Sequence, residues 1–501
     1  MDANADRADG YAARLFARDF RDPQLIRPNA DGAALGGHPL FLGTASSPAG
    51  IEGQMIPSRH RWTHPKIRQG IELVLEGLRE SEDPMLAAQD YRTLVAELGR
   101  LRGRDLFLPY LSSGRGRGVR VRLADGRSLL DLALGIGVHF FGHGDPDLIR
   151  TALEAALEDT AMQGNLQMGT VLLELLELVI ANAGGRLRHG WIANCGSEAN
   201  EIALKIIRQR RAPASEIVAF RGCFHGRTTV MAEITDRAEY REGQPLRETV
   251  HYLPFYDHAD PGSADTVLAR LRELLAARRG RIACMVFELV QGESGFRTAP
   301  REFFEPLMRE CHDAGVAVWV DEIQTFGRTG ELFAFDKLGL RSHVDVVTIG
   351  KLLHCAATLY TEEYNPRPGL VSGTFAGCTV GLAVGRRIVE RLLYEGFLGA
   401  DGRIARLGTT AEARLRRLAA DLGRDRVRTI DGVGAMWALE LASADHADAL
   451  RLVRCCFDAG LLLYYGGTGP YRLRLFLPAT LDEADLDEAA DILGRCLRDP
   501  G

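Results

Sequence analysis

Lysine is scarce in this sequence: the 61 basic residues of the 501-residue chain include only four lysines, Lys66, Lys205, Lys337 and Lys351. Any chemistry that needs an amine nucleophile therefore has very few candidates. The sequence also lacks a run of about 18 apolar residues, which argues against a membrane-spanning segment. Its N-terminal stretch is acidic and has no continuous apolar core, so it does not have the pattern of a secretory signal.

The nine cysteines contain no CxxC pair, and their scatter does not provide the clustered ligands of a structural zinc site. We expect no metal site, and we expect the thiols to be reduced and mostly buried, as in a cytoplasmic protein. The net charge of −6 gives no reason to expect nucleic acid or an anionic membrane as a partner. The composition is that of an ordinary globular chain, long enough to bury a large core.

We predict four parts along the chain. Residues 1–105 form an N-terminal extension of unknown role, with a charged helical run from about Pro65 to Arg102. Residues 106–165 form the first part of a small domain and contain two short strands around an Asp125-Gly126 turn. Residues 166–385 form a large α/β domain, and residues 386–501 complete the small domain as an α+β unit.

Short apolar runs alternate with helical stretches between about residues 186 and 350. The runs are HGWIAN, EIVAF, ACMVFELV, VAVWVDE and DVVTIG. This alternation is typical of an α/β fold with a mostly parallel central sheet and helices on both faces. Ligands bind such sheets outside the carboxyl ends of the strands.

Three clusters fall at such strand ends. Gly196 and Ser197 open a long helix, where free N–H groups and a hydroxyl suit a phosphate, although a simple helix cap would look the same. Asp321 ends a strongly apolar strand; it suits a protonated ring nitrogen or is a surface carboxylate. Lys351 follows DVVTIG in an apolar setting, which favours the lowered pKa that a Schiff-base lysine needs.

Several motifs occur in the order seen in class III aminotransferases, which include ornithine, N-acetylornithine and 4-aminobutyrate aminotransferases. These motifs are NCGSEANEIALK, FRGCFHGRTT, FELVQGESG, VWVDEIQTFGRTGELFAF, VTIGK and SGTFAG. The resemblance runs from about residue 110 to the C-terminus. It implies a fold-type I enzyme that depends on pyridoxal 5'-phosphate and transfers amino groups.

The resemblance also implies roles for individual cofactor-binding residues. Lys351 resembles the lysine that carries the cofactor as a Schiff base and moves the proton during catalysis. Asp321 resembles the partner of the pyridine nitrogen, and Gln324 the donor to the ring hydroxyl. Gly196 and Ser197 resemble the phosphate cradle. The remaining contacts are a ring stacked on the pyridine, its neighbour, and a residue that reaches the phosphate of a second subunit in a homodimer: Phe224, His225 and Thr374.

Substrate contacts follow from the same resemblance. Arg227 resembles an arginine that holds a substrate carboxylate, and a guanidinium suits that task. Arg474 resembles the arginine that receives the α-carboxylate of 2-oxoglutarate or glutamate, with Glu288 as the partner that masks it. Gly137 and Val138 are similar to a loop at the substrate entrance. These likenesses indicate ping-pong transfer from an ω-amino acid or similar amine to 2-oxoglutarate.

The sequence departs from the family after Lys351. The glycine-rich turn is replaced by LLHCAATLYTEEYNP, and the span to Thr374 is shorter than usual. Substrate identity, including whether the acceptor is 2-oxoglutarate or pyruvate, therefore stays open. An aminomutase, epimerase or decarboxylase on the same scaffold, or a catalytically silent relative, also stays open.

Overall fold

A seven-stranded sheet forms the centre of the computed structural model, which describes residues 64–81 and 85–499. Most of the predicted N-terminal extension lies outside these residues. The strand order is β5-β13-β12-β11-β8-β6-β7, and β13 alone runs antiparallel to its neighbours β12 and β5. The predicted mostly parallel sheet is confirmed. The strands are β5 (Leu187–Ala193), β6 (Glu216–Phe220), β7 (Val250–Leu253), β8 (Ile282–Phe287), β11 (Ala317–Glu322), β12 (Val346–Ile349) and β13 (Ala356–Thr361).

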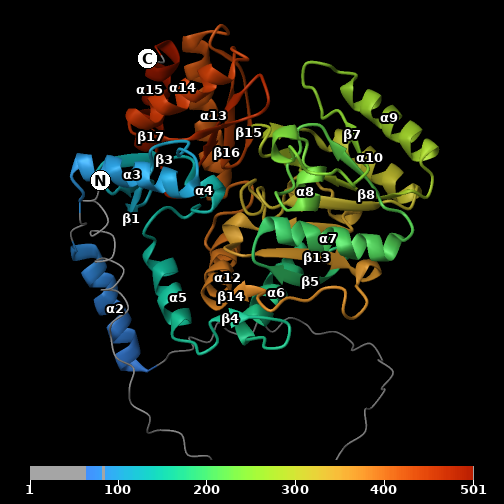
Figure 1. The fold of residues 1–501 in the computed structure, drawn as a ribbon, viewed down its shortest axis with the longest axis horizontal. Helices are drawn as coiled ribbons and strands as arrows, with labels where there is room; N and C mark the ends of the chain where they lie inside the picture. The colour runs from blue at the N-terminus through green and yellow to red at the C-terminus, as the bar shows by residue number, and fades with distance from the viewer. Residues whose placement is uncertain (1–63, 82–84, 500–501) are drawn as a thin grey trace, which may run out of the picture. The chain divides into compact units, whose positions relative to one another are not determined.

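Helices cover both faces of this sheet (Figure 1). The side chains of β11 belong to two different cores. Ala317 and Trp319 belong to one hydrophobic core, whereas Val318 and Val320 belong to another. Successive side chains of a strand point to opposite faces, so each face has its own core. Helix α7 (Gly196–Arg211) and α8 (Thr229–Ile234) supply the first core. The second core receives α6 (Thr170–Ala183), α9 (Ser263–Ala277), α10 (Arg301–Asp313) and α12 (Thr379–Tyr394).

Two four-stranded sheets involve the C-terminal part of the chain. One has the order β15-β16-β19-β18, and the other has the order β1-β2-β3-β17. Because β17 pairs with β3, a C-terminal strand completes a sheet that begins near residue 112. The strands are β1 (Ser112–Arg117), β2 (Arg120–Leu123), β3 (Ser128–Asp131), β15 (Val427–Val433), β16 (Met436–Leu441), β17 (Leu461–Leu462), β18 (Tyr464–Gly466) and β19 (Arg472–Phe476). The boundaries of the four predicted parts stay a prediction.

The helical run expected from Pro65 to Arg102 consists of two helices, α2 (Pro65–Glu80) and α3 (Ala88–Arg102). The other helices of two turns or more are α5 (Pro146–Ala156), α13 (Arg403–Leu422), α14 (His446–Asp458) and α15 (Glu483–Arg498). None of the helices in residues 64–81 and 85–499 combines the length and the hydrophobicity that crossing a membrane requires.

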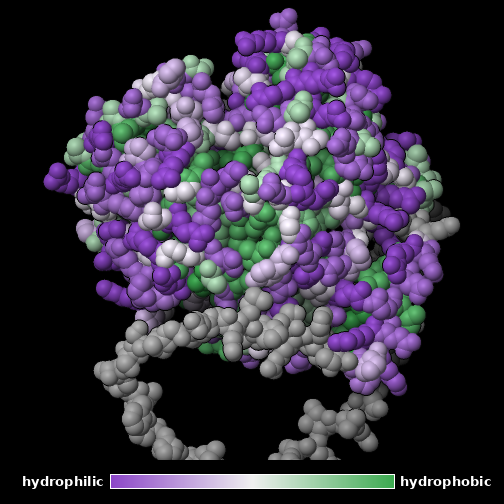
Figure 2. All heavy atoms as spheres, turned by 180° about the vertical axis from the view of Figure 1, so that it is seen from behind, coloured by the Kyte–Doolittle hydropathy of each residue, from purple (hydrophilic) through white to green (hydrophobic). Residues whose placement is uncertain are grey.

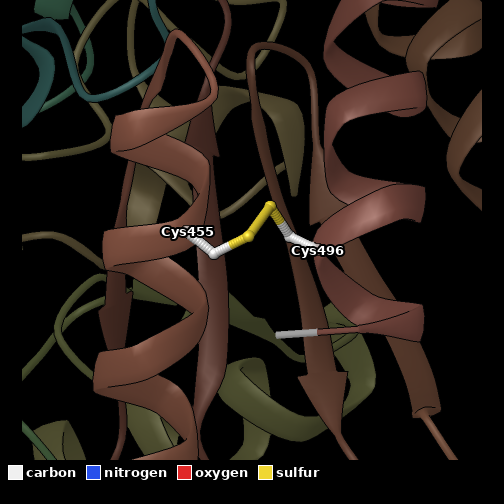
Figure 3. The surroundings of a disulfide bond; sticks show 2 residues. All are labelled: Cys455 and Cys496. Carbon is white, nitrogen blue, oxygen red and sulfur yellow. A yellow bond between two sulfur atoms is a disulfide. The ribbon is translucent and has the colours of Figure 1, made fainter. Parts of the chain in front are cut away.

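One expectation about the cysteines is wrong. Cys455 on α14 and Cys496 on α15 form a disulfide, so not all nine thiols are free (Figure 3). The two helices pack against each other and bring the sulfur atoms together, although 41 residues separate them in sequence. Of the seven free cysteines, Cys195 and Cys378 are exposed and the other five are buried.

Candidate active site

Three predicted residues meet at the carboxyl edge of the large sheet. In the parallel pairing of β11 with β12, Asp321 lies opposite Thr348 and Glu322 opposite Ile349. Lys351 follows β12 by two residues, so it emerges at the same edge as Asp321. Gly196 begins α7 just beyond β5. The structure therefore brings together the lysine, the acid and the helix N-terminus, at the edge where open α/β sheets bind ligands.

Asp321 is buried and held by three donors. Its Oδ2 accepts a hydrogen bond from Asn200 Nδ2 at 2.9 Å and lies 2.8 Å from Nδ1 of His225, while Oδ1 accepts from the Ile323 N–H at 3.0 Å. Burial by itself would lower the pKa of His225, but Cys223 and the hydrogen bond to Asp321 raise that pKa well above its usual value. These contacts fix the carboxylate at the strand end, where it can face a ring nitrogen.

The turn at the start of α7 makes a close approach to the FHGR loop. Ser197 Oγ accepts a hydrogen bond from the Arg227 N–H at 3.2 Å. Gly226 has a φ of 131°, and a Cβ there would lie 2.4 Å from Ser197 Oγ, so only glycine allows this approach. The free N–H groups at the start of a 16-residue helix suit a phosphate.

Three buried side-chain atoms around this edge indicate whether the site can hold pyridoxal phosphate. Gln324 Oε1, His225 Nε2 and Asn200 Oδ1 are buried and have no hydrogen-bond partner within the described residues. Buried polar atoms normally have hydrogen-bond partners, and the polar groups of a bound pyridine ring could supply the missing ones here. Gly292 packs directly on Gln324, because a Cβ at Gly292 would lie 2.1 Å from Oε1. The residues present fit the cofactor.

Lys351 lies in a strained turn, with a φ of 47° and with His354 at 58° closing it through an N–H bond to the Lys351 carbonyl at 3.0 Å. Burial lowers the pKa of the Lys351 amine to about 8. Glu293 opposes this shift, whereas the positive Arg474 and Arg328 support it. A neutral amine close to physiological pH is what a Schiff-base lysine requires.

The expected pairing of Glu288 with Arg474 is wrong in this structure. Arg474 Nη1 donates to Glu293 Oε1 at 2.7 Å and to the Gly292 carbonyl at 3.1 Å. Burial raises the pKa of Glu293, but Arg474 and Lys351 outweigh it and hold that pKa at about 2.

Glu288 has a different role. It accepts hydrogen bonds from the Phe224 N–H at 3.0 Å and the Gly292 N–H at 2.8 Å. Burial, as the largest cause, raises its pKa to about 7. Glu288 therefore ties the Phe224 loop to the Glu293 turn, while Glu293 masks Arg474.

The remaining predicted residues lie around this centre. The exposed Arg227 guanidinium stacks 3.7 Å over the ring of Tyr240, whose own ring centroid lies 6.1 Å from that of Phe224. Gly137 belongs to the short turn α4 (Leu134–Gly137), with Val138 next to it. Thr374 is exposed, and its carbonyl lies close to Gly164. The role expected for Thr374 requires a second subunit and stays a prediction.

Three residues of the site were not predicted. Glu293 stands five residues after Glu288 in the same FELVQGESG motif, and Asn200 one helical turn after Gly196 in NCGSEAN. Their positions in these motifs were the available signals. Arg328 stands in the GRTG motif, where its burial could not be read from the sequence.

A lysine and a buried acid at the carboxyl edge, beside a helix N-terminus, form a site that fits pyridoxal phosphate. Comparison with known proteins gives the family. A profile of the family described as aminotransferase class-III matches residues 104–497. The chain belongs to the class III aminotransferases, and its cofactor is pyridoxal phosphate.

Among its relatives is a mitochondrial acetylornithine aminotransferase of Alnus glutinosa, 30% identical over 76% of this chain and 82% of the relative. A 2-aminoadipate transaminase of Pseudomonas putida is 30% identical over 77% of this chain and 95% of the relative. The fold matches a solved lysine aminotransferase from M. tuberculosis in the internal aldimine form. That match has a TM-score of 0.72 at 23% identity, over 81% of this chain and all of the other.

Proposed function

We propose that this aminotransferase moves an amino group from an ω-amino acid or similar amine to 2-oxoglutarate by a ping-pong mechanism. The observation that carries the proposal is the Glu293–Arg474 pair beside Lys351. While Arg474 is paired with Glu293, the pair presents no net charge to an amine that lacks an α-carboxylate. If Glu293 swings away, the same arginine can bind the α-carboxylate of a 2-oxo acid. One site can then accept two unlike substrates in turn.

Each residue has a task in this proposal. Bound pyridoxal phosphate supplies an electron sink for the negative charge that develops on the substrate carbon. The neutral Lys351 amine would take the proton from that carbon and pass it to the bound cofactor. Asp321, held by Asn200 and His225, would face the ring nitrogen from the strand end. The phosphate would rest at Gly196 and Ser197, and Gln324 would bind the ring hydroxyl.

Half-reaction spectra test the proposal directly. Purified holoenzyme is mixed with glutamate in one cuvette and with 4-aminobutyrate in another, without a second substrate. We expect both amines to bleach the visible band of the lysine-bound cofactor, and 2-oxoglutarate to restore it. If glutamate leaves the band unchanged, 2-oxoglutarate is not the acceptor, and pyruvate would be tested next.

Glu293→Gln should separate the two substrates. Without its negative charge Arg474 is no longer neutralised, so kcat/KM for 4-aminobutyrate should fall on the order of 10-fold, whereas KM for 2-oxoglutarate should not rise. Glu440→Gln is the matched control, because Glu440 pairs at 2.7 Å with Arg472, which lies on β19 like Arg474. The two half-reactions of each variant are measured by stopped-flow absorbance. Equal losses for both substrates in Glu293→Gln would contradict the assigned role.

The lowered pKa of Lys351 predicts that, in the apoprotein, its amine reacts with aldehydes at a lower pH than other lysines do. Only the neutral amine attacks an aldehyde, so a pKa of about 8 makes Lys351 reactive at a pH where an ordinary lysine, with a pKa of about 10.4, is protonated. Reductive alkylation with formaldehyde, quantified by peptide mass spectrometry, should rise through pH 8 at Lys351. The exposed Lys337 serves as the internal comparison. Superimposable profiles at the two lysines would contradict the prediction.

A homodimer with the site at the subunit interface belongs to the same proposal. Thr374 is exposed in the single chain, and its neighbour Phe375 is 56% exposed. On the adjacent loop, Leu166 is 90% exposed. Asn165 and Ser372 connect the two loops by a side-chain hydrogen bond at 3.1 Å. Figure 2 shows apolar side chains gathered in a depression of the molecular surface.

We also propose the cytoplasm as the location, although the Cys455–Cys496 bond is unusual for a reducing compartment.

A further inference from the structure

Arg227 differs from the other arginines around it. The chain around the FHGR loop holds four arginines, and three of them have oxygen partners: Arg221 pairs with Asp236, whereas Arg237 and Arg241 donate to backbone carbonyls. The side chain of Arg227 is exposed, and in the described part of the chain it forms no hydrogen bond or ion pair. Its guanidinium is therefore an accessible cation with unused N–H donors.

An aromatic ring holds this guanidinium instead of an oxygen partner. The Arg227 guanidinium lies 3.7 Å from the centroid of the Tyr240 ring, and the next shortest distance of this kind among the described residues is 4.0 Å, from Arg391 to Phe141. Such a contact uses the face of the guanidinium, whereas a carboxylate binds the N–H groups in its plane. Tyr240 can therefore fix the cation and leave its donors free.

Tyr240 is itself anchored on both sides in sequence. It ends the short helical turn η1 (Ala238–Tyr240). Directly before this turn, the buried Arg237 donates to the Glu293 carbonyl at 3.2 Å. Directly after it, Arg241 donates to three backbone carbonyls at the end of α8, at 2.6 to 3.4 Å. These anchors fix the place of the Tyr240 ring and connect it to the turn that carries Glu293.

The Tyr240–Arg227 pair lies beside the residues predicted to hold the cofactor. The ring centroids of Tyr240 and Phe224 are 6.1 Å apart with their planes at 88°, and the Arg227 guanidinium lies 5.9 Å from the Phe224 ring. The backbone N–H of Arg227 donates to Ser197 Oγ in the predicted phosphate turn at 3.2 Å. A carboxylate bound to this guanidinium would therefore lie next to the candidate active site.

We propose that Tyr240 is a positioning residue that determines substrate specificity: it holds the Arg227 guanidinium by its face, so that the N–H groups can bind a substrate carboxylate. This inference rests on the proposed function. A free arginine side chain loses conformational entropy when it binds a ligand, and a side chain that is already ordered loses less. Tyr240 should therefore favour amines that carry a carboxylate over amines that lack one.

The test compares 4-aminobutyrate with butylamine, which differ by one carboxylate. First half-reaction rates of the holoenzyme are measured over a range of amine concentrations. In Tyr240→Leu we expect KM for 4-aminobutyrate to rise about 5-fold with little change in kcat, and the ratio of kcat/KM for 4-aminobutyrate to that for butylamine to fall about 5-fold. Tyr240→Phe is the matched control. It keeps the ring and removes only a hydroxyl that has no partner in the described residues, so it should retain the wild-type ratio.

A double-mutant cycle shows whether Tyr240 acts through Arg227. Arg227→Met should lower the same ratio more than Tyr240→Leu does, because it removes the donors themselves. Adding Tyr240→Leu to Arg227→Met should then change the ratio less than about 2-fold, since the ring has no cation left to hold. Additive losses, an equal loss with both amines in Tyr240→Leu, or no loss with either would overturn the proposal. If Tyr240→Leu does not fold, Tyr240→Met decides by the same criteria.

Binding of the unreactive dicarboxylate glutarate separates this proposal from the proposed function. Calorimetry on the holoenzyme needs no turnover, and glutarate affinity should fall about 5-fold in Tyr240→Leu and stay at the wild-type value in Tyr240→Phe. If the wild-type enzyme transfers no amino group from either amine, the proposed function fails, and these affinities alone decide the role of Tyr240. Equal affinities in the three proteins, or no glutarate binding by wild type, would overturn that role.

Discussion

Replacing Lys351 with alanine should abolish amino transfer, with a loss of roughly 10⁴-fold or more. Lys351 is the single lysine at the carboxyl edge of the large sheet within residues 64–81 and 85–499. Of the other three lysines, Lys66 and Lys205 lie on helices α2 and α7, and Lys337 ends the short helix α11 (Ala334–Lys337). No neighbouring amine can therefore replace it, either as the cofactor anchor or as the base that moves the proton.

The measurement combines activity with absorbance. Purified Lys351→Ala should lack the visible band of the lysine-bound cofactor, and wild type should show it. Lys337→Ala is the matched control, since it removes a lysine from the same part of the chain without touching the site; it should keep both the band and the activity. An equal band in wild type and Lys351→Ala would show that the cofactor is attached elsewhere.

Asp321→Asn should lower kcat on the order of 100- to 1000-fold. The substitution keeps the shape of the side chain but removes the negative charge that faces the proposed ring nitrogen. It also removes the charge partner of His225, whose pKa the hydrogen bond to Asp321 raises. We therefore expect the pKa of His225 to fall in this variant. The measurements are half-reaction rates and an NMR titration of the histidine ring.

Asp345→Asn provides a matched control for the loss of a buried carboxylate. Asp345 is also fully buried, and its Oδ2 lies 3.0 Å from Nε2 of His312, but it precedes β12 at the opposite edge of the same sheet. Asp345→Asn should therefore lower the melting temperature without changing the half-reaction rates of the folded enzyme. Comparable rate losses in the two variants would show that Asp321 acts only through stability.

The central sheet and the lysine–acid pair were predictable because they depend on local patterns. The apolar runs that end in Asp321 and precede Lys351 are short, rich in branched residues and bounded by polar residues, which predicts buried strands. Parallel strands then place their carboxyl ends at one edge. Only the resemblance to a family, however, assigned the individual cofactor contacts.

The parts that were not predicted depend on tertiary contacts. Glu288 and Glu293 lie in one motif. Glu288 follows β8 directly, whereas Glu293 lies in the turn between the short strands β9 (Val290–Gln291) and β10 (Arg297–Thr298), and this turn brings it to Arg474. The disulfide requires the packing of α14 on α15, which has no spacing signal. The polar sequence SSGRGR of β1 likewise gave no apolar pattern.

The antiparallel strand β13 has a consequence for how the site assembles during folding. Val346 on β12 pairs with Tyr360 on β13, and the Lys351 turn connects the two strands directly, without a crossover helix. This is the most local pairing in the sheet. The pairings of β11 with β8 and of β13 with β5 must instead close much longer loops. The lysine is therefore positioned by a contact that the chain can form early, whereas the phosphate turn after β5 arrives only with the long-range pairing of β13 with β5.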